Sequence, residues 1–168
     1  MIKLFMTVCL LTSLLFASST DKAFIPDIKY IMDYDKNTSC LVRHLKVYKE
    51  PKWVAKIEVR SGKSVYFSSP KSMFEFYHRP GKWFEVGVKS ERDFSKIIVT
   101  DFNTLKPIDA EKAFFVYGSR AISPAGDDLV PFKTEEAAEK FSKDYSGKRI
   151  FKFEEVSDAL IRLINGRI

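Results

Sequence analysis

The chain has 168 residues, of which 45% are hydrophobic and fifteen are Phe, a composition that indicates one folded domain and excludes an intrinsically disordered chain. Its formal net charge is +6, but the Lys and Arg residues are scattered along the sequence rather than gathered in one run. This scatter favours a solvated basic surface over a nucleic-acid interface.

The start of the chain predicts a cleavable secretion signal over residues 1–19. A short positive stretch, residues 1–3, precedes the apolar run 4–16, and small residues at 17–19 suit cleavage before Thr20. The apolar run is about 13 residues, shorter than the roughly 20 that cross a bilayer, so we expect no stable membrane insertion; a retained anchor is the alternative. The mature protein is then expected in a bacterial periplasm, which also argues against a nucleic-acid partner.

Cys40 would be the one thiol left after removal of the signal, because Cys9 lies inside the apolar run. A lone thiol in an oxidising compartment cannot form an internal disulfide. Three alternatives stay open: a buried inert thiol, a dimer linked through Cys40, or a reactive or metal-binding thiol.

Residues 20–38 are polar and irregular, and we expect a loose N-terminal arm there. In residues 53–60 apolar and polar side chains alternate, which predicts a strand, and the turn residues 61–63 lead into a return strand over 64–67. Ser69 is then a helix cap, with Pro70 at the first helical position.

That first helix is expected to end at Pro80-Gly81 and to be followed by a strand over 96–102. The second half repeats the order: strands over 113–117 and 128–132, a helix from the cap Thr134 to Gly147, a strand over 149–153, and a short helix from Ser157 to Ile164.

The overlay of Phe67 on Phe132 and of Phe76 on Phe141 indicates two similar units joined around residues 103–112. We therefore predict an α+β fold, two strand–strand–helix–strand units in tandem, forming a single domain over residues 39–168. The core and the sheet–helix interface are expected to hold most of the aromatic residues, namely Phe74, Phe76, Trp83, Phe84, Phe114, Phe115, Phe151 and Phe153.

Several blocks, in order over roughly residues 38–156, resemble the family of the nitrous oxide reductase accessory protein NosL. In the second half these are residues 112–119, 123–126, 129–132, 136–141 and 147–156. In the first half they are Cys40 with residues 48–57, then 67–77 and 99–102.

The resemblance implies a periplasmic protein that binds Cu(I) and helps to deliver it to nitrous oxide reductase. Its expected partners are nitrous oxide reductase or its assembly machinery. The family fold, a pair of strand–strand–helix–strand units, agrees with the pattern described above.

The sequence departs from the family at the ligand positions. The family's opening motif Cys-x-x-Cys-Gly-Met and its later Pro-Met-Gly correspond here to residues 40–45 and 124–126. Only Cys40 is retained: Arg43 stands at the second Cys, and Leu45 and Ala125 stand at the two Met positions.

Cu(I) is a soft ion that takes thiolate, thioether or imidazole ligands. The candidate ligands are therefore Cys40 first, then His44, with Met73 and His78 as possible third ligands. Met73 also fits the apolar face of its helix, and His78 also fits an interaction with the last carbonyls of that helix.

Two functions are consistent with these residues. The first is a Cu(I) chaperone for nitrous oxide reductase assembly, and the alternative is a metal-free family member acting as a periplasmic binding or scaffolding module. No enzyme is expected, because the chain lacks paired mature thiols, a Ser–His–Asp pattern and a phosphate-binding glycine loop. Asp101, Asp127 and Asp128 are interpreted as solvated carboxylates rather than catalytic ones.

Overall fold

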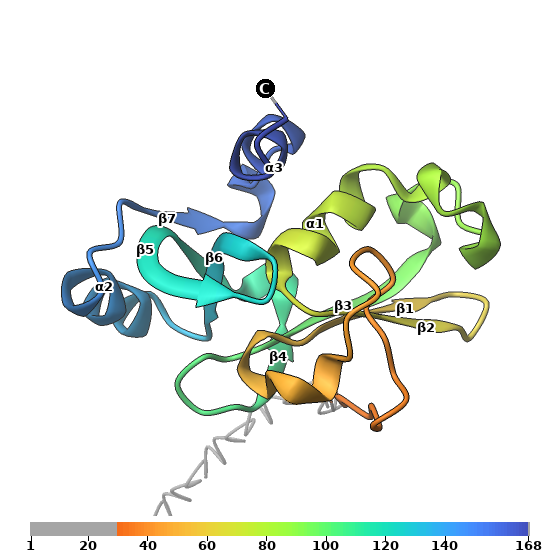
Figure 1. Ribbon diagram of the computed structural model, residues 1–168, viewed down its shortest axis with the longest axis horizontal. Helices are drawn as coiled ribbons and strands as arrows, with labels where there is room; N and C mark the ends of the chain where they lie inside the picture. The colour runs from red at the N-terminus through yellow and green to blue at the C-terminus, as the bar shows by residue number, and fades with distance from the viewer. Residues whose placement is uncertain (1–29, 168) are drawn as a thin grey trace, which may run out of the picture.

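The computed structural model describes residues 30–167 (Figure 1). The expected secretion signal and residues 20–29 of the expected arm lie outside these residues. The first unit contains an antiparallel sheet with the strand order β2-β1-β3-β4. Its strands are β1 (Ala55–Val59), β2 (Ser64–Phe67), β3 (Phe94–Thr100) and β4 (Pro107–Asp109). Helix α1 (Pro70–His78) connects β2 to β3.

The second unit repeats the arrangement of β1, β2, α1 and β3, without a counterpart of β4. Strands β5 (Phe114–Ser123), β6 (Gly126–Phe132) and β7 (Arg149–Lys152) form a sheet in the order β6-β5-β7, and helix α2 (Glu135–Asp144) connects β6 to β7. In both sheets the first strand of the unit is central, and its first residue pairs with the last residue of the second strand, Ala55 with Phe67 and Phe114 with Phe132. The expected tandem α+β fold is confirmed, and helix α3 (Asp158–Ile164) follows it.

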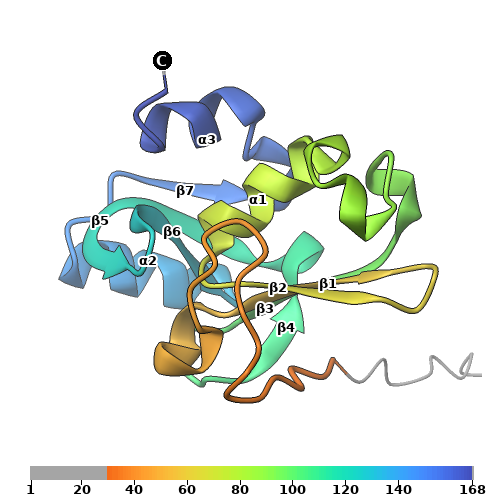
Figure 2. The ribbon, with the colours of Figure 1, turned by 45° about the vertical axis from the view of Figure 1, so that its right-hand side comes forward.

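The three predicted helix starts are confirmed by their caps. Ser69, Thr134 and Ser157 each accept a hydrogen bond from the backbone N–H three residues later, which satisfies a donor that the helix itself cannot. Helix α1 packs on β1 and β2 of the first sheet, on β6 of the second, and on α3, so it lies where the two units meet (Figures 1 and 2).

Gly147 follows α2 as expected, but for a different physical reason. The left-handed residue after the helix is Ser146, with φ at 58°. The Gly147 N–H donates to the Ser142 carbonyl at 2.8 Å, and a Cβ at position 147 would lie 2.5 Å from Val116 Cγ1. Gly147 is therefore required by close packing on β5 rather than by its backbone angles.

Phe74, Phe76, Phe115, Phe151 and Phe153 are buried in one large core, as expected. The expectation fails for Phe84, whose side chain is 86% exposed. Phe84 begins a short 3-10 helix between α1 and β3, which Gly87 ends with a left-handed φ of 78°.

Residues 30–38, the described part of the expected arm, are fastened to the outer face of the first sheet. Lys56 on β1 is one of the polar residues of the alternating stretch 53–60, yet its side chain is only 2% exposed. Its ammonium pairs with Asp33 at 2.6 Å and donates to the Ile31 carbonyl at 3.2 Å, and Tyr66 donates to Asp33 at 2.7 Å. Residues 30–38 therefore cover the face of the sheet on which the alternating pattern places polar side chains.

Two of the three carboxylates expected in solvent are buried. Asp101, which follows β3, accepts the Lys133 N–H at 2.7 Å, and Asp128 on β6 accepts the Lys71 N–H at 2.7 Å. Each acid therefore binds the backbone beside the helix start of the other unit, a place where N–H groups lack helical partners. Burial raises the pKa of Asp128, while Asp127 is exposed as expected.

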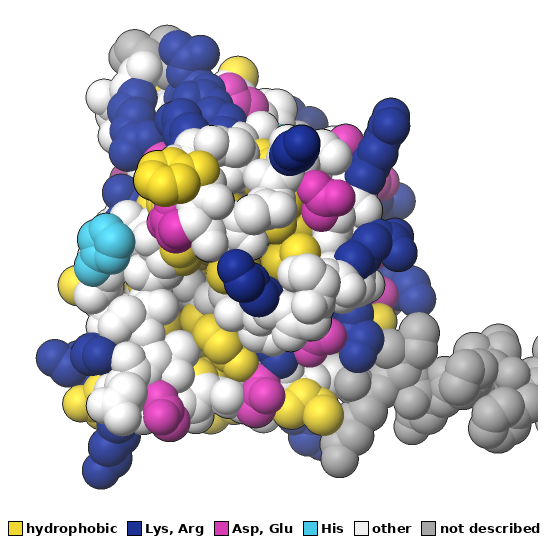
Figure 3. Space-filling model, turned by 90° about the vertical axis from the view of Figure 1, so that its right-hand side faces the viewer, with side chains coloured by type: hydrophobic (Ala, Val, Ile, Leu, Met, Phe, Trp, Pro, Cys, Tyr) yellow, Lys and Arg dark blue, Asp and Glu magenta, His cyan; other side chains and the backbone are white. Residues whose placement is uncertain are grey.

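On the face shown in Figure 3, Lys and Arg side chains gather at the top and along the right-hand edge, and others stand singly across the face. Within residues 30–167 no helix is long and apolar enough to cross a membrane.

Candidate functional site

Cys40 is held in a tight turn over residues 40–45. The Cys40 N–H donates to the Leu45 carbonyl at 2.8 Å, and the His44 N–H donates to the Cys40 carbonyl at 2.9 Å. The Arg43 backbone N–H donates to the Cys40 sulfur at 3.3 Å. At 1% exposure the sulfur is closed off, so a disulfide to a second chain would require this turn to open.

His44 shares the turn with Cys40 but faces water. Its φ of 58° is left-handed, which completes the reversal of the chain, and its side chain is exposed. The two best candidate ligands are therefore adjacent in the fold, one on the buried side of the turn and one on its exposed side.

The Arg43 side chain fastens this turn to α1 and to the chain end. Its guanidinium donates to Ser72 Oγ at 3.3 Å, to Glu75 Oε2 at 3.2 Å and to Asn165 Oδ1 at 2.6 Å. Glu75, with a side chain 7% exposed, also pairs with Arg167 and accepts from Asn165 Nδ2 at 3.2 Å. The position of the family's second thiol is thus occupied by an ion-pair network.

A second cation lies beside Ala125, one of the two positions where the family has Met. The ammonium of Lys71, on the first turn of α1, donates to the Ala125 carbonyl at 2.7 Å and to the Ile164 carbonyl at 3.3 Å. Burial lowers the pKa of Lys71, and the positive charge of Arg43 lowers it further, against the attraction of Asp128.

The two family motif segments meet although about 80 residues separate them. Residues 40–45 reach α1 through Arg43, and residues 123–126 reach it through Lys71. A surface groove of about 380 Å³ joins them, lined by Leu45, Lys46, Lys49, Glu50, Ile122, Ser123 and Pro124. The opening loop and the β5–β6 hairpin lie side by side in Figures 1 and 2.

The two remaining candidate ligands are engaged elsewhere in α1. Met73 is fully buried and belongs to the same core cluster as Cys40. His78, on the last turn, stacks on Phe74, and its Nε2 hydrogen-bonds the Val156 carbonyl at 2.8 Å; burial lowers its pKa. In the described part of the chain, no three His, Cys, Asp or Glu side chains are grouped as a metal site would need.

Lys71 and Glu75 are the site residues that sequence reasoning missed. They lie four residues apart on one face of α1, a spacing that normally marks a solvated face. Their partners Arg43, Ala125, Ile164 and Arg167 come from segments far away in sequence, so no local pattern indicates their burial.

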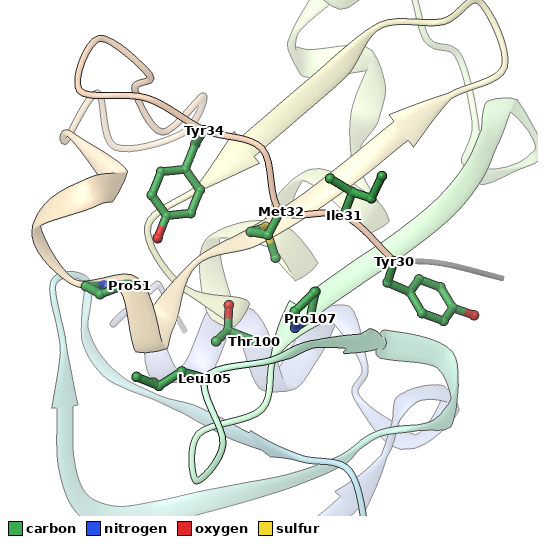
Figure 4. Close-up of a pocket in the computed structure, with 8 residues that line it drawn as sticks. All are labelled: Tyr30, Ile31, Met32, Tyr34, Pro51, Thr100, Leu105 and Pro107. Atoms are coloured by element: carbon green, nitrogen blue, oxygen red, sulfur yellow. The ribbon is translucent and has the colours of Figure 1, made fainter. Parts of the chain in front are cut away.

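A second pocket, of about 320 Å³, lies between the arm and the β3–β4 connection (Figure 4). Its walls carry no charged side chain and are formed by Tyr30, Ile31, Met32, Tyr34, Pro51, Thr100, Leu105 and Pro107.

The fold and the site define a two-unit α+β protein whose duplicated sheets bring a buried thiol and a hairpin turn to one helix. The family model NosL matches residues 31–161, and the chain belongs to the NosL family, as the sequence resemblance predicts.

The crystal structure of the copper chaperone NosL from Shewanella denitrificans is similar, with 21% identity over 78% of this chain and 98% of that one, at a TM-score of 0.66. The solution structure of apo-NosL from Achromobacter cycloclastes aligns with 22% identity over 64% of this chain and 87% of that one, at a TM-score of 0.46. No curated protein matches the sequence.

Proposed function

We propose that this chain is a copper-handling accessory protein that works in the periplasm and carries Cu(I) for the assembly of nitrous oxide reductase. Cys40 is the primary ligand and His44 the second. Membership of the NosL family supports this proposal. Copper is the cargo, so the chain performs no bond-breaking chemistry.

The observation that carries the proposal is the meeting of the two motif segments at α1. Cys40 keeps its position in a turn whose backbone N–H already points at the sulfur. The thiol is closed off, so loading requires the 40–45 turn to lift, and the exposed imidazole of His44 lies on the side from which an ion would enter. A thiolate with one imidazole suits a soft ion that must later be released.

A second candidate function is a metal-free binding or scaffolding module, and it is favoured by two cations near the motif segments, the buried Lys71 and the partly exposed Arg43. A unit charge about 5 Å from a bound ion costs about 3 kcal/mol at an effective dielectric near 20. For Arg43 this cost is offset by Glu75, whose carboxylate accepts from the guanidinium. The Lys71 ammonium donates to two uncharged carbonyls instead, which do not neutralise its charge.

An anaerobic titration separates the two functions. The reduced protein without residues 1–19 is titrated with Cu(I) against a competing chelator, beside Cys40→Ser, His44→Ala and the control His78→Gln. Copper handling requires one tightly held ion that is lost in Cys40→Ser, weakened in His44→Ala and kept in His78→Gln. Failure of the unmodified protein to compete with the chelator would reject copper handling and leave the scaffold function.

A further inference from the structure

The groove beside the Cys40 turn exposes apolar side chains from both halves of the chain. Leu45 is 42% exposed on one wall and Ile122 is 61% exposed on the other, with Pro124 beside it. Single exposed apolar residues are ordinary on protein surfaces. Here two of them face one hollow of about 380 Å³ from separate segments, which is the arrangement of an anchor pocket.

The rim of the same groove is basic. Lys46 and Lys49 line it, with Glu50 as the one acidic lining residue. Lys46 donates to the uncharged Asn37 carbonyl at 2.6 Å. No ion pair within residues 30–167 involves Lys46 or Lys49, so both positive charges are available to a partner.

The basic character extends along the whole segment that forms this wall. Residues 43–52 contain four Lys or Arg residues and one acid, and Tyr48, which is 40% exposed, stands among them. Long-range attraction would therefore favour an acidic ligand, while the hollow between Leu45 and Ile122 would accept an apolar side chain.

We propose that this groove binds a segment of a partner protein in which acidic side chains flank an apolar anchor. The identity of this partner rests on the proposed function. Leu45 and Pro124 belong to the two motif segments beside Cys40, so the protein bound in the groove would be the one that exchanges copper at Cys40. The binding itself needs no metal.

A displayed library of random peptides, each roughly 12 residues long, is panned on the protein without residues 1–19, and the selected peptide is then measured by fluorescence anisotropy. Selected peptides should be rich in Asp and Glu around Leu, Ile, Met or Phe, and their affinity should fall as salt rises. Enrichment of basic or charge-free peptides, or of none, would overturn the proposal.

The variants localise the binding. Leu45→Ser with Ile122→Ser should weaken the selected peptide about tenfold or more, and Lys46→Glu with Lys49→Glu should weaken it and remove most of the salt dependence. The matched control Phe84→Ser with Lys89→Glu removes one exposed apolar residue and one cation elsewhere and should leave affinity within about twofold. Equal effects in the control would refute the groove as the site.

Two further readouts separate the alternatives. A concentration-dependent dimer that Leu45→Ser with Ile122→Ser dissociates would replace the acidic partner by a second copy of this chain. Cys40→Ser should keep peptide binding while losing Cu(I). Peptide binding without copper binding therefore rejects the proposed function alone, and copper binding without peptide binding rejects the groove alone.

Discussion

Glu75→Gln tests whether the Glu75 network keeps the Cys40 turn closed. The carboxylate, with a side chain 7% exposed, neutralises Arg43 and Arg167, whose side chains are 25% and 46% exposed. Removal of one partner from a fully buried ion pair costs roughly 3–5 kcal/mol, whereas an exposed pair contributes about 0–1 kcal/mol. Since both arginines retain access to water, we expect the free energy of unfolding to fall by about 2 kcal/mol.

The same substitution should expose the thiol. Arg43 links the network to the turn, because its side chain binds Glu75 and its backbone N–H binds the Cys40 sulfur. With that side chain released, Cys40 should react faster with a thiol reagent such as Ellman's reagent. A weakening of the closed turn by about 1.4 kcal/mol corresponds to about a tenfold higher rate if modification follows local opening.

Urea unfolding and thiol-modification kinetics measure the two effects, with Glu139→Gln as the control because Glu139 is exposed on α2. A Glu75→Gln protein that matches the control in both stability and thiol reactivity would refute the role of this network. A less stable protein with unchanged thiol reactivity would show that α1 and α3 are tied together without closing the turn.

Three further predictions concern the rest of the chain. Burial lowers the pKa of His78, so the unfolded state binds its proton more readily, and stability should fall as pH drops below about 6.5; His78→Gln should flatten that part of the pH profile in urea unfolding. Gly147→Ala would place a Cβ 2.5 Å from Val116 Cγ1 and should cost about 1–3 kcal/mol, measured by thermal unfolding. Lys56→Met leaves Asp33 without its cation, and limited proteolysis should then cut residues 30–38 faster than in the unmodified protein.

The elements that could be predicted from the sequence are those whose determining contacts lie within a few residues of one another. Ser69, Thr134 and Ser157 start helices because each cap bonds an N–H three residues away, and Pro70 reinforces the first. The tandem repeat was visible because equivalent positions such as Phe67 and Phe132 hold the same place in their sheets.

Features that depend on distant partners were not predictable in this way. Lys56 is buried because Asp33, 23 residues earlier, covers it, and no alternation within β1 encodes that contact. Cys40 was predicted as the candidate thiol, but its burial in the core cluster that contains Met73 and Phe74 has no local sequence signal. Charges on a short helix indicate a solvated face unless their counterparts are known, which is why Glu75 was missed.

Two buried carboxylates make each repeat depend on the other for folding. Asp101 of the first repeat and Asp128 of the second each hold backbone N–H groups of the opposite repeat. A fragment containing only one repeat would keep its acid and lose the donor, while its own helix start would lose the acceptor. Both halves should therefore unfold in a single cooperative transition, and neither should fold when expressed alone. Mixing the two separately expressed halves should restore the native fold, because together they supply both acids and both sets of donors.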